Sequence, residues 1–123
     1  MVCLHTGFAQ ALLKMDGNPD VEAPNSIGAV LDGSDERLLR WIDETGLVTL
    51  IADNYAVESL PGRARAGRHP FLPLHEHCLF KLGVHLGELW YLSELAAGSG
   101  RLGATASCSR RHPCDCRAQS VRR

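Results

Sequence analysis

The residues Ser34-Asp-Glu-Arg-Leu-Leu-Arg-Trp-Ile-Asp-Glu-Thr-Gly46 are followed directly by Leu47-Val-Thr-Leu-Ile-Ala52. The first segment predicts an amphipathic helix, with Ser34 as its N-cap, acidic residues in its first turn and Gly46 at its end. The second segment is almost continuously apolar, which is typical of a strand buried on both faces of a parallel sheet. A helix that runs at once into such a strand predicts an α/β fold.

Shorter patterns extend this alternation towards both ends of the chain. Residues 2 to 4 are apolar and predict a strand, and residues 8 to 15 predict a helix. Apolar residues recur at helical spacing in residues 74 to 82, so a short amphipathic helix is expected there, with Gly83 as its stop. The alternation in residues 84 to 88 then predicts a strand that leads into a helix over residues 89 to 97.

Potential metal ligands are concentrated in this last part of the chain. His75, Glu76, His77, His85 and Glu88 occur close together in the sequence. Imidazole and carboxylate groups together suit zinc or manganese, and a helix, turn and strand can bring a His and a Glu into contact. The simpler interpretation is a set of solvated polar residues on a surface helix, because a His-x-His pair with a distant Glu is a common pattern.

Three segments resemble the cyclase family of metal-dependent hydrolases, which includes the bacterial kynurenine formamidases. Residues Val2-Cys-Leu-His-Thr-Gly7 are similar to the family's VLLxTG strand, and residues 46 to 58 are similar to its GVxxVGxDxxSVD segment. The third segment contains His77, an apolar stretch with a glycine, Glu88 and a Leu-Trp-Tyr-Leu run, and it resembles the later metal-binding segment of the family. The three matches occur in the family's order and cover residues 1 to 97.

The resemblance leaves the metal ligands partly open. In the family the main metal motif, His-x-Gly-Thr-His-x-Asp, precedes the VLLxTG strand, and the sequence contains nothing like it. Glu88 is carried over as a ligand, whereas the histidine position corresponds to His75, Glu76 or His77. The resemblance therefore implies the later part of a cyclase-family domain with a swivelling β/β/α-type fold, which is expected to be inactive without the first motif.

The same resemblance implies the chemistry. Family members use a divalent metal, zinc or manganese, to make a water nucleophilic, and the water attacks an amide or formamide carbon such as that of N-formylkynurenine. The expected partner is thus a small-molecule substrate from tryptophan catabolism. The resemblance is also compatible with a homo-oligomer.

Composition limits the other possibilities. The 123 residues include 45% hydrophobic residues, which fits one small folded domain. A formal net charge of -1 gives no general attraction to nucleic acid or to a membrane surface. The sequence shows neither a long apolar run nor the start of a signal peptide, so the expected location is the cytoplasm.

Two further positions offer possible polar sites. Asp53 and Asn54 follow the apolar strand, at the end where α/β folds place ligands, but Asp53 can equally cap the turn that follows it. Two of the five cysteines, Cys3 and Cys78, fall in apolar segments and are expected to be buried free thiols.

The composition changes abruptly at residue 98. Residues 98 to 123 are rich in Arg, Ser, Gly and Cys and contain few residues that could pack, so a disordered tail is expected. A zinc site made of Cys108, His112, Cys114 and Cys116 is an alternative, although the ligands are unusually crowded. Such a site would make the chain a small non-enzymatic zinc-binding protein, and a remnant without catalytic function is the other non-enzymatic possibility.

A frameshift also explains this tail. When each codon starts one nucleotide earlier, permissible synonymous codons allow residues 106 to 123 to be reread as Phe-Leu-Leu-Thr-Ala-Pro-Pro-Leu-Arg-Leu-Pro-Gly-Ala-Val-Gly-Ser-Pro. That segment resembles the closing strand of the cyclase family. The expected organisation is therefore a cyclase-like part over residues 1 to 97 and an aberrant tail over residues 98 to 123.

Overall fold

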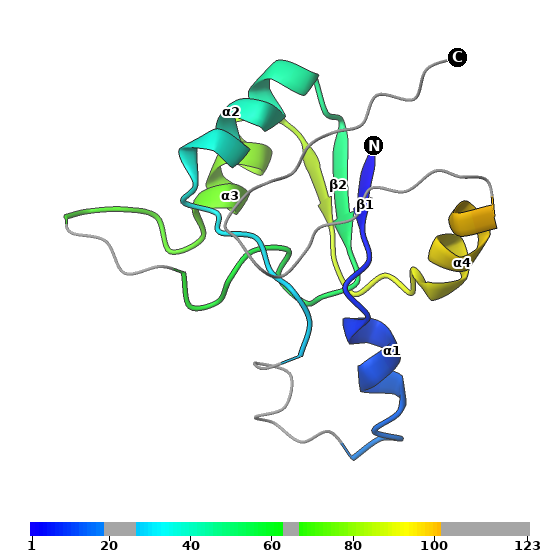
Figure 1. Ribbon diagram of the computed structural model, residues 1–123. Helices are drawn as coiled ribbons and strands as arrows, with labels where there is room; N and C mark the ends of the chain where they lie inside the picture. Colours follow the sequence, from blue (N-terminus) through cyan, green and yellow to red (C-terminus); the bar gives the residue numbers. More distant parts are fainter. Residues whose placement is uncertain (19–26, 63–66, 102–123) are drawn as a thin grey trace.

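The computed structural model describes residues 1–18, 27–62 and 67–101. Helices and strands alternate along this part of the chain (Figure 1). The elements are β1 (Val2–Leu4), α1 (Phe8–Leu13), α2 (Glu36–Thr45), β2 (Thr49–Ala52), α3 (Pro73–His75), the π-helical segment η2 (Glu76–Leu82), β3 (His85–Gly87) and α4 (Ser93–Arg101).

The three strands form one parallel sheet in the order β1-β2-β3. The register pairs Val2 with Leu50 and Thr49 with His85, so β2 is the central strand. Since parallel strands need crossover connections, helical segments lie between successive strands along the chain. This arrangement confirms the predicted α/β class.

The core lies between the sheet and the helices that Figure 1 shows beside β2, namely α2 and α3. Leu50 and Ala52 of β2 belong to this core, together with Ile42 of α2 and Leu74 and Cys78 of the 73 to 82 helix. Ile51 is also buried but lies outside this cluster, because neighbouring residues of a strand point to opposite faces. Burial on both faces explains the continuous apolar run seen in the sequence.

Helix α2 begins one residue later than the sequence analysis predicted. Its N-cap is Asp35, whose side chain accepts a hydrogen bond from the Arg37 N–H at 2.8 Å. The prediction of Ser34 as the cap is therefore wrong by one residue, and the Ser34 N–H donates to Asp32 Oδ1 in the preceding turn. The helix ends as predicted at Gly46, which has the left-handed φ of 60° that a C-terminal stop requires.

The helix predicted over residues 74 to 82 is confirmed. It starts at Pro73, changes to the wider π-helical geometry at Glu76 and stops at Gly83, where φ is 68°. Leu74 and Cys78 are both fully buried, and their spacing of four residues places them on one face of the helix. His75 and His77 consequently point in different directions, His75 towards Glu88 and His77 towards Asp43.

The helix predicted over residues 89 to 97 begins four residues later, at Ser93. The N–H groups of Leu89 and Trp90 donate to the carbonyl oxygens of Asn54 and Ala52, at 2.9 and 3.3 Å. These bonds hold residues 89 and 90 at the end of the sheet, and the positive φ of 55° at Leu89 is incompatible with a helix there. Helix α4 then continues to Arg101, and thus includes residues 98 to 101, which the sequence analysis assigned to the tail.

The remaining tail predictions concern residues 102 to 123, which lie outside the described residues, as do Cys108, His112, Cys114 and Cys116. Within the described residues, none of the helices combines the length and the apolar character that a membrane crossing requires.

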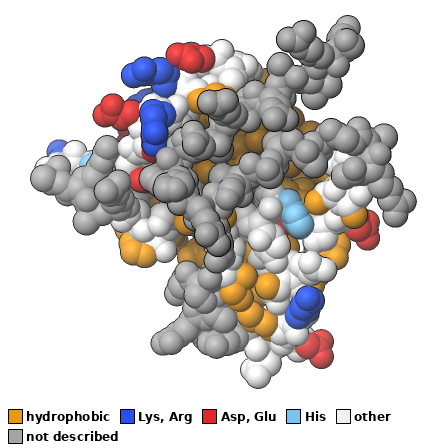
Figure 2. Space-filling view, in the orientation of Figure 1, with side chains coloured by type: hydrophobic (Ala, Val, Ile, Leu, Met, Phe, Trp, Pro, Cys, Tyr) orange, Lys and Arg blue, Asp and Glu red, His pale blue; other side chains and the backbone are white. Residues whose placement is uncertain are grey.

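Hydrophobic side chains reach the surface at several places (Figure 2), and Phe71 and Phe80 are among the most exposed of them. Exposed apolar surface of this kind favours association between chains.

Cys78 behaves as a core residue. It is fully buried, whereas Cys3 is only partly buried, and both are free thiols. Burial raises the pKa of the Cys78 thiol to about 11, and the nearby charges of Glu58 and Asp43 act in the same direction. The thiol therefore stays protonated at neutral pH.

We expect iodoacetamide to alkylate Cys78 at least about a hundredfold more slowly in the folded chain than in the urea-unfolded chain, because the thiolate is the reacting form. Peptide mapping by mass spectrometry measures the rate at this cysteine separately from the others. Equal rates at Cys78 in the folded and unfolded chains would contradict the burial of the thiol.

Candidate functional site

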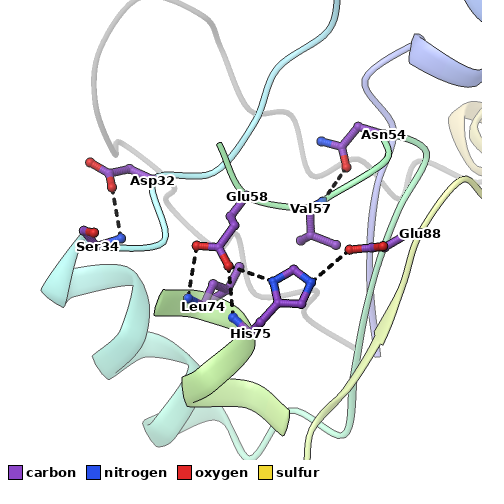
Figure 3. A network of polar contacts seen from close by, with 8 residues as sticks. All are labelled: Asp32, Ser34, Asn54, Val57, Glu58, Leu74, His75 and Glu88. Atoms are coloured by element: carbon purple, nitrogen blue, oxygen red, sulfur yellow. Dashed lines mark hydrogen bonds and ion pairs between the residues drawn. The ribbon is translucent and has the colours of Figure 1, made fainter. Parts of the chain in front are cut away.

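Three ionisable side chains from separate segments meet beside the sheet (Figure 3). Glu58 follows β2, His75 ends α3, and Glu88 comes directly after β3. His75 lies between the two carboxylates: its Nδ1 is 2.7 Å from Glu58 Oε1 and its Nε2 is 3.1 Å from Glu88 Oε1. We call these three residues the Glu58–His75–Glu88 cluster.

Solvent reaches one end of this cluster. The Glu58 side chain is 1% exposed, that of His75 is 21% exposed and that of Glu88 is 34% exposed. The cluster thus extends from a buried carboxylate, through a partly buried imidazole, to a carboxylate at the surface. The side chains of His75 and Glu88 are therefore partly open to solvent, whereas that of Glu58 is almost fully enclosed by protein.

The buried carboxylate of Glu58 caps the helix that carries His75. Its Oε2 accepts the N–H of Leu74 at 3.1 Å, and its Oε1 accepts the N–H of His75 at 3.0 Å. Pro73, at the first helical position, has no N–H, and the local N-cap residue Leu72 has no side chain that could accept these bonds. Glu58 therefore supplies the missing cap from a distant segment, and the positive end of the helix stabilises its charge.

The loop before α2 encloses Glu58 from the other side. Leu31 forms a parallel bridge with Glu58, in which the N–H of Leu31 donates to Val57 O at 3.1 Å and the N–H of Ser59 donates to Leu31 O at 2.8 Å. Gly33 of the same loop lies so close to the carboxylate that a Cβ at this position would overlap it. A side chain at position 33 would therefore displace the Glu58 carboxylate from its present position.

The structure separates the four residues predicted as metal ligands. His75 and Glu88 are brought together, but His77 Nε2 lies 2.8 Å from Asp43 Oδ1 on α2, and Glu76 pairs with Lys81 Nζ at 3.0 Å. Within the parts of the chain that the structure describes, no group of three His, Cys, Asp or Glu side chains is arranged to hold a metal ion. His75 and Glu88 are thus two potential metal ligands, and the described residues place no third ligand beside them.

Asp53 has a structural role at the end of the sheet. Its fully buried carboxylate accepts the N–H and the hydroxyl of Thr6, both at 2.7 Å, and the N–H of Gly7 at 2.8 Å. The side chain of Asn54 is also engaged: it donates to Ala29 O at 3.0 Å and accepts the N–H of Val57 at 2.8 Å. Asp53 therefore caps the turn after β1, and not the predicted turn that follows it in the sequence.

Glu58 was not among the residues that the sequence patterns predicted for the site. The residue closes the segment from 46 to 58 that resembles the cyclase family, and an acidic residue directly after Ala56 and Val57 was the available signal. An ionisable residue among apolar neighbours is either exposed or paired, and here it is buried and paired.

Comparisons of the chain with protein-family models, with curated proteins and with solved structures each found no match.

Proposed function

We propose that residues 1 to 97 form the later part of a cyclase-family metal-dependent hydrolase domain of the swivelling β/β/α type. In this proposal His75 and Glu88 are neighbouring ligands of a divalent metal ion, zinc or manganese. The substrate is a small molecule with an amide or formamide bond, of the N-formylkynurenine type. The observation that supports the proposal most directly is the approach of His75 Nε2 to Glu88 Oε1.

The geometry of this pair suits two ligands of one ion. Two adjacent ligands of a tetrahedral zinc ion lie about 3.4 Å apart, given metal–ligand distances close to 2.1 Å. The two atoms here are 3.1 Å apart, so little movement would bring both into position. An imidazole nitrogen and a carboxylate oxygen are also a donor set that zinc and manganese accept.

A complete site needs more donors than this pair. A catalytic zinc ion usually has three protein ligands, and the described residues supply two. The family resemblance would assign the others to a His-x-Gly-Thr-His-x-Asp segment, which the 123 residues do not contain. We therefore expect these residues to bind a metal weakly and to show no significant formamidase activity.

The residues of the cluster have separate tasks in this proposal. When bound, a divalent metal polarises a carbonyl oxygen and makes water nucleophilic at neutral pH. His75 and Glu88 hold the ion at the solvent-reached end of the cluster, where a substrate can approach. Glu58 remains buried behind His75 and does not touch the substrate.

The test is metal binding by the full chain in a background in which Cys108, Cys114 and Cys116 are replaced by Ser. We expect Glu88→Gln and His75→Gln each to weaken Zn²⁺ binding by more than about tenfold, because each removes one of two ligands. Isothermal titration calorimetry with Zn²⁺ alone measures the affinity. Titration with Mn²⁺ should also broaden the NMR signals of the His75 ring before those of the other histidines.

Two matched histidine variants serve as controls. His77→Gln removes an imidazole that contacts Asp43, and His85→Gln removes one that is exposed to solvent. Both substitutions should leave the affinity for Zn²⁺ unchanged. Loss of binding in His77→Gln, with retention in His75→Gln, would refute the assignment. If the chain with its own cysteines binds Zn²⁺ irrespective of Glu88, and the Ser background does not bind it, the chain is instead a zinc-binding module that uses its tail.

A further inference from the structure

Each nitrogen of the His75 ring lies within hydrogen-bond distance of a carboxylate, and the two carboxylates are not equivalent. Glu58 Oε1 faces Nδ1 at 2.7 Å, and Glu88 Oε1 faces Nε2 at 3.1 Å. The first contact is shorter, and its partner is buried, whereas the second lies near solvent. The partner of one imidazole nitrogen decides which nitrogen keeps the proton, so Glu58 has the stronger influence on the ring.

The contacts of Glu58 identify it as an acceptor. Backbone N–H groups can only donate, and the carboxylate accepts two of them, from Leu74 and from His75. An ionised carboxylate with both oxygens engaged in this way accepts the proton of Nδ1–H as well. In the ring that carries one proton, that proton therefore lies on Nδ1, and Nε2 presents a lone pair.

A lone pair on Nε2 has a direct consequence for the contact with Glu88. An imidazole lone pair and a carboxylate oxygen are both acceptors, and at 3.1 Å they repel each other unless a cation lies between them. A proton or a metal ion can fill that position. By keeping the proton on Nδ1, the buried carboxylate of Glu58 thus leaves the Nε2 lone pair available to bind a cation together with Glu88.

We propose that Glu58 is a positioning residue that fixes the Nδ1–H tautomer of His75 and directs the Nε2 lone pair at the ion shared with Glu88. The inference rests on the proposed function for the identity of that ion, but not for the position of the proton. Glu58 also holds the backbone of His75, so a single carboxylate sets both the location of the ring and its protonated nitrogen.

The surroundings of Glu58 make this positioning rigid. The backbone on both sides of Glu58 is bonded to Leu31, and Val57 before it is held by the side chain of Asn54. Gly33 and Leu74 close the space around the carboxylate. Carboxylates that bond the second nitrogen of a metal-binding histidine typically change metal affinity 10- to 100-fold when they are removed.

The first measurement needs no variant. Nitrogen-15 NMR of the metal-free full chain, at a pH where the His75 ring carries one proton, reports which nitrogen is protonated. We expect the proton on Nδ1, and a ring protonated on Nε2 with a bare Nδ1 would overturn the inference. This readout remains decisive even if variants at position 58 do not fold.

The second measurement compares Zn²⁺ affinity in Glu58→Gln with that of the parent chain, both with Ser at the three tail cysteines. The amide cannot accept all three bonds, since one of its two heteroatoms is a donor. We expect the dissociation constant to rise by about 10- to 100-fold, with the methyl signals of Ile42 and Leu50 unchanged as evidence of an intact core. An unchanged affinity in the folded variant would refute the positioning role.

The two proposals fail in different ways. If the parent chain does not bind Zn²⁺ while the His75 proton lies on Nδ1, the metal site of the proposed function is refuted and the tautomer inference is supported. If the parent chain binds Zn²⁺ through His75 and Glu88 while the Glu58→Gln variant binds equally well, the metal site stands and the role of Glu58 is refuted.

Discussion

Replacement of Gly33 by Ala is expected to destabilise the protein by about 3 to 5 kcal/mol, although it adds only one methyl group. The new Cβ would overlap Glu58 Oε2 and would lie 2.7 Å from Glu58 Cδ and 3.0 Å from Leu74 Cβ. The carboxylate cannot move aside without losing its bonds to Leu74 and His75. A buried charge that loses its partners is costly, and this cost explains the size of the effect.

Urea unfolding followed by circular dichroism measures this change. Gly98→Ala is the matched control, because it makes the same chemical change within α4, where a Cβ meets nothing within 4 Å. The control should be neutral or stabilising by up to about 1 kcal/mol, since Ala favours a helix over Gly. Similar effects of the two substitutions would show that Gly33 does not pack against Glu58.

A double variant isolates the contact itself. Glu58→Ala removes the group that the new methyl would overlap, so Gly33→Ala should cost much less in that background than in the parent chain. The difference between the two costs is the coupling between the positions. Simple additivity would contradict a direct steric conflict and would point to an independent backbone effect at Gly33.

Local sequence signals were sufficient for the main elements of the fold. The helix that ends at Gly46 and the strand after it are encoded by caps and by a continuous apolar run, and both occur close to the predicted positions. The helix before Gly83 is encoded in the same way. Each of these signals depends on residues that are near one another in the chain, and a single sequence displays them directly.

The late start of α4 could not be predicted from such signals. Residues 89 to 92 have a helical apolar pattern, but the N–H groups of Leu89 and Trp90 bond to carbonyl oxygens beside β2, far away in the sequence. Leu89 also adopts a positive φ of 55°, which is incompatible with a helix at that point. Tertiary hydrogen bonds override the local preference here.

The sequence predicted His75 and Glu88 among several candidates for the site, but tertiary structure decides which candidates meet. His75, Glu76 and His77 are consecutive residues at similar distances from Glu88 in the sequence, and their directions depend on which face of the helix is buried. Leu74 and Cys78 define that face, so His75 points towards Glu58 and Glu88 while His77 points towards α2. Glu58 reaches the site from a distant segment, and neither composition nor spacing indicates that approach.

The second large effect on stability is expected at Asp53, which directly follows the last residue of β2. We expect Asp53→Asn to destabilise the fold by about 2 to 4 kcal/mol, although the two side chains have nearly the same shape. One oxygen of Asp53 accepts both the N–H and the hydroxyl of Thr6, and the other accepts the N–H of Gly7. Whichever way the amide of Asn turns, its NH₂ group meets a backbone N–H and leaves that donor without an acceptor in a buried place.

Asp43→Asn is the matched control for this change, because the Asp43 side chain is about half exposed (47%) and its carboxylate contacts the ring of His77 at 2.8 Å. An exposed pair of this kind contributes less than about 1 kcal/mol, and Asn can still accept a hydrogen bond from the ring. Urea unfolding of both variants separates the effects, and backbone amide signals of Thr6 and Gly7 report the turn after β1 directly. If Asp53→Asn unfolded at the same urea concentration as Asp43→Asn, with those two amide signals unshifted, the turn would be held by its own backbone geometry and Asp53 would be free to serve as a ligand.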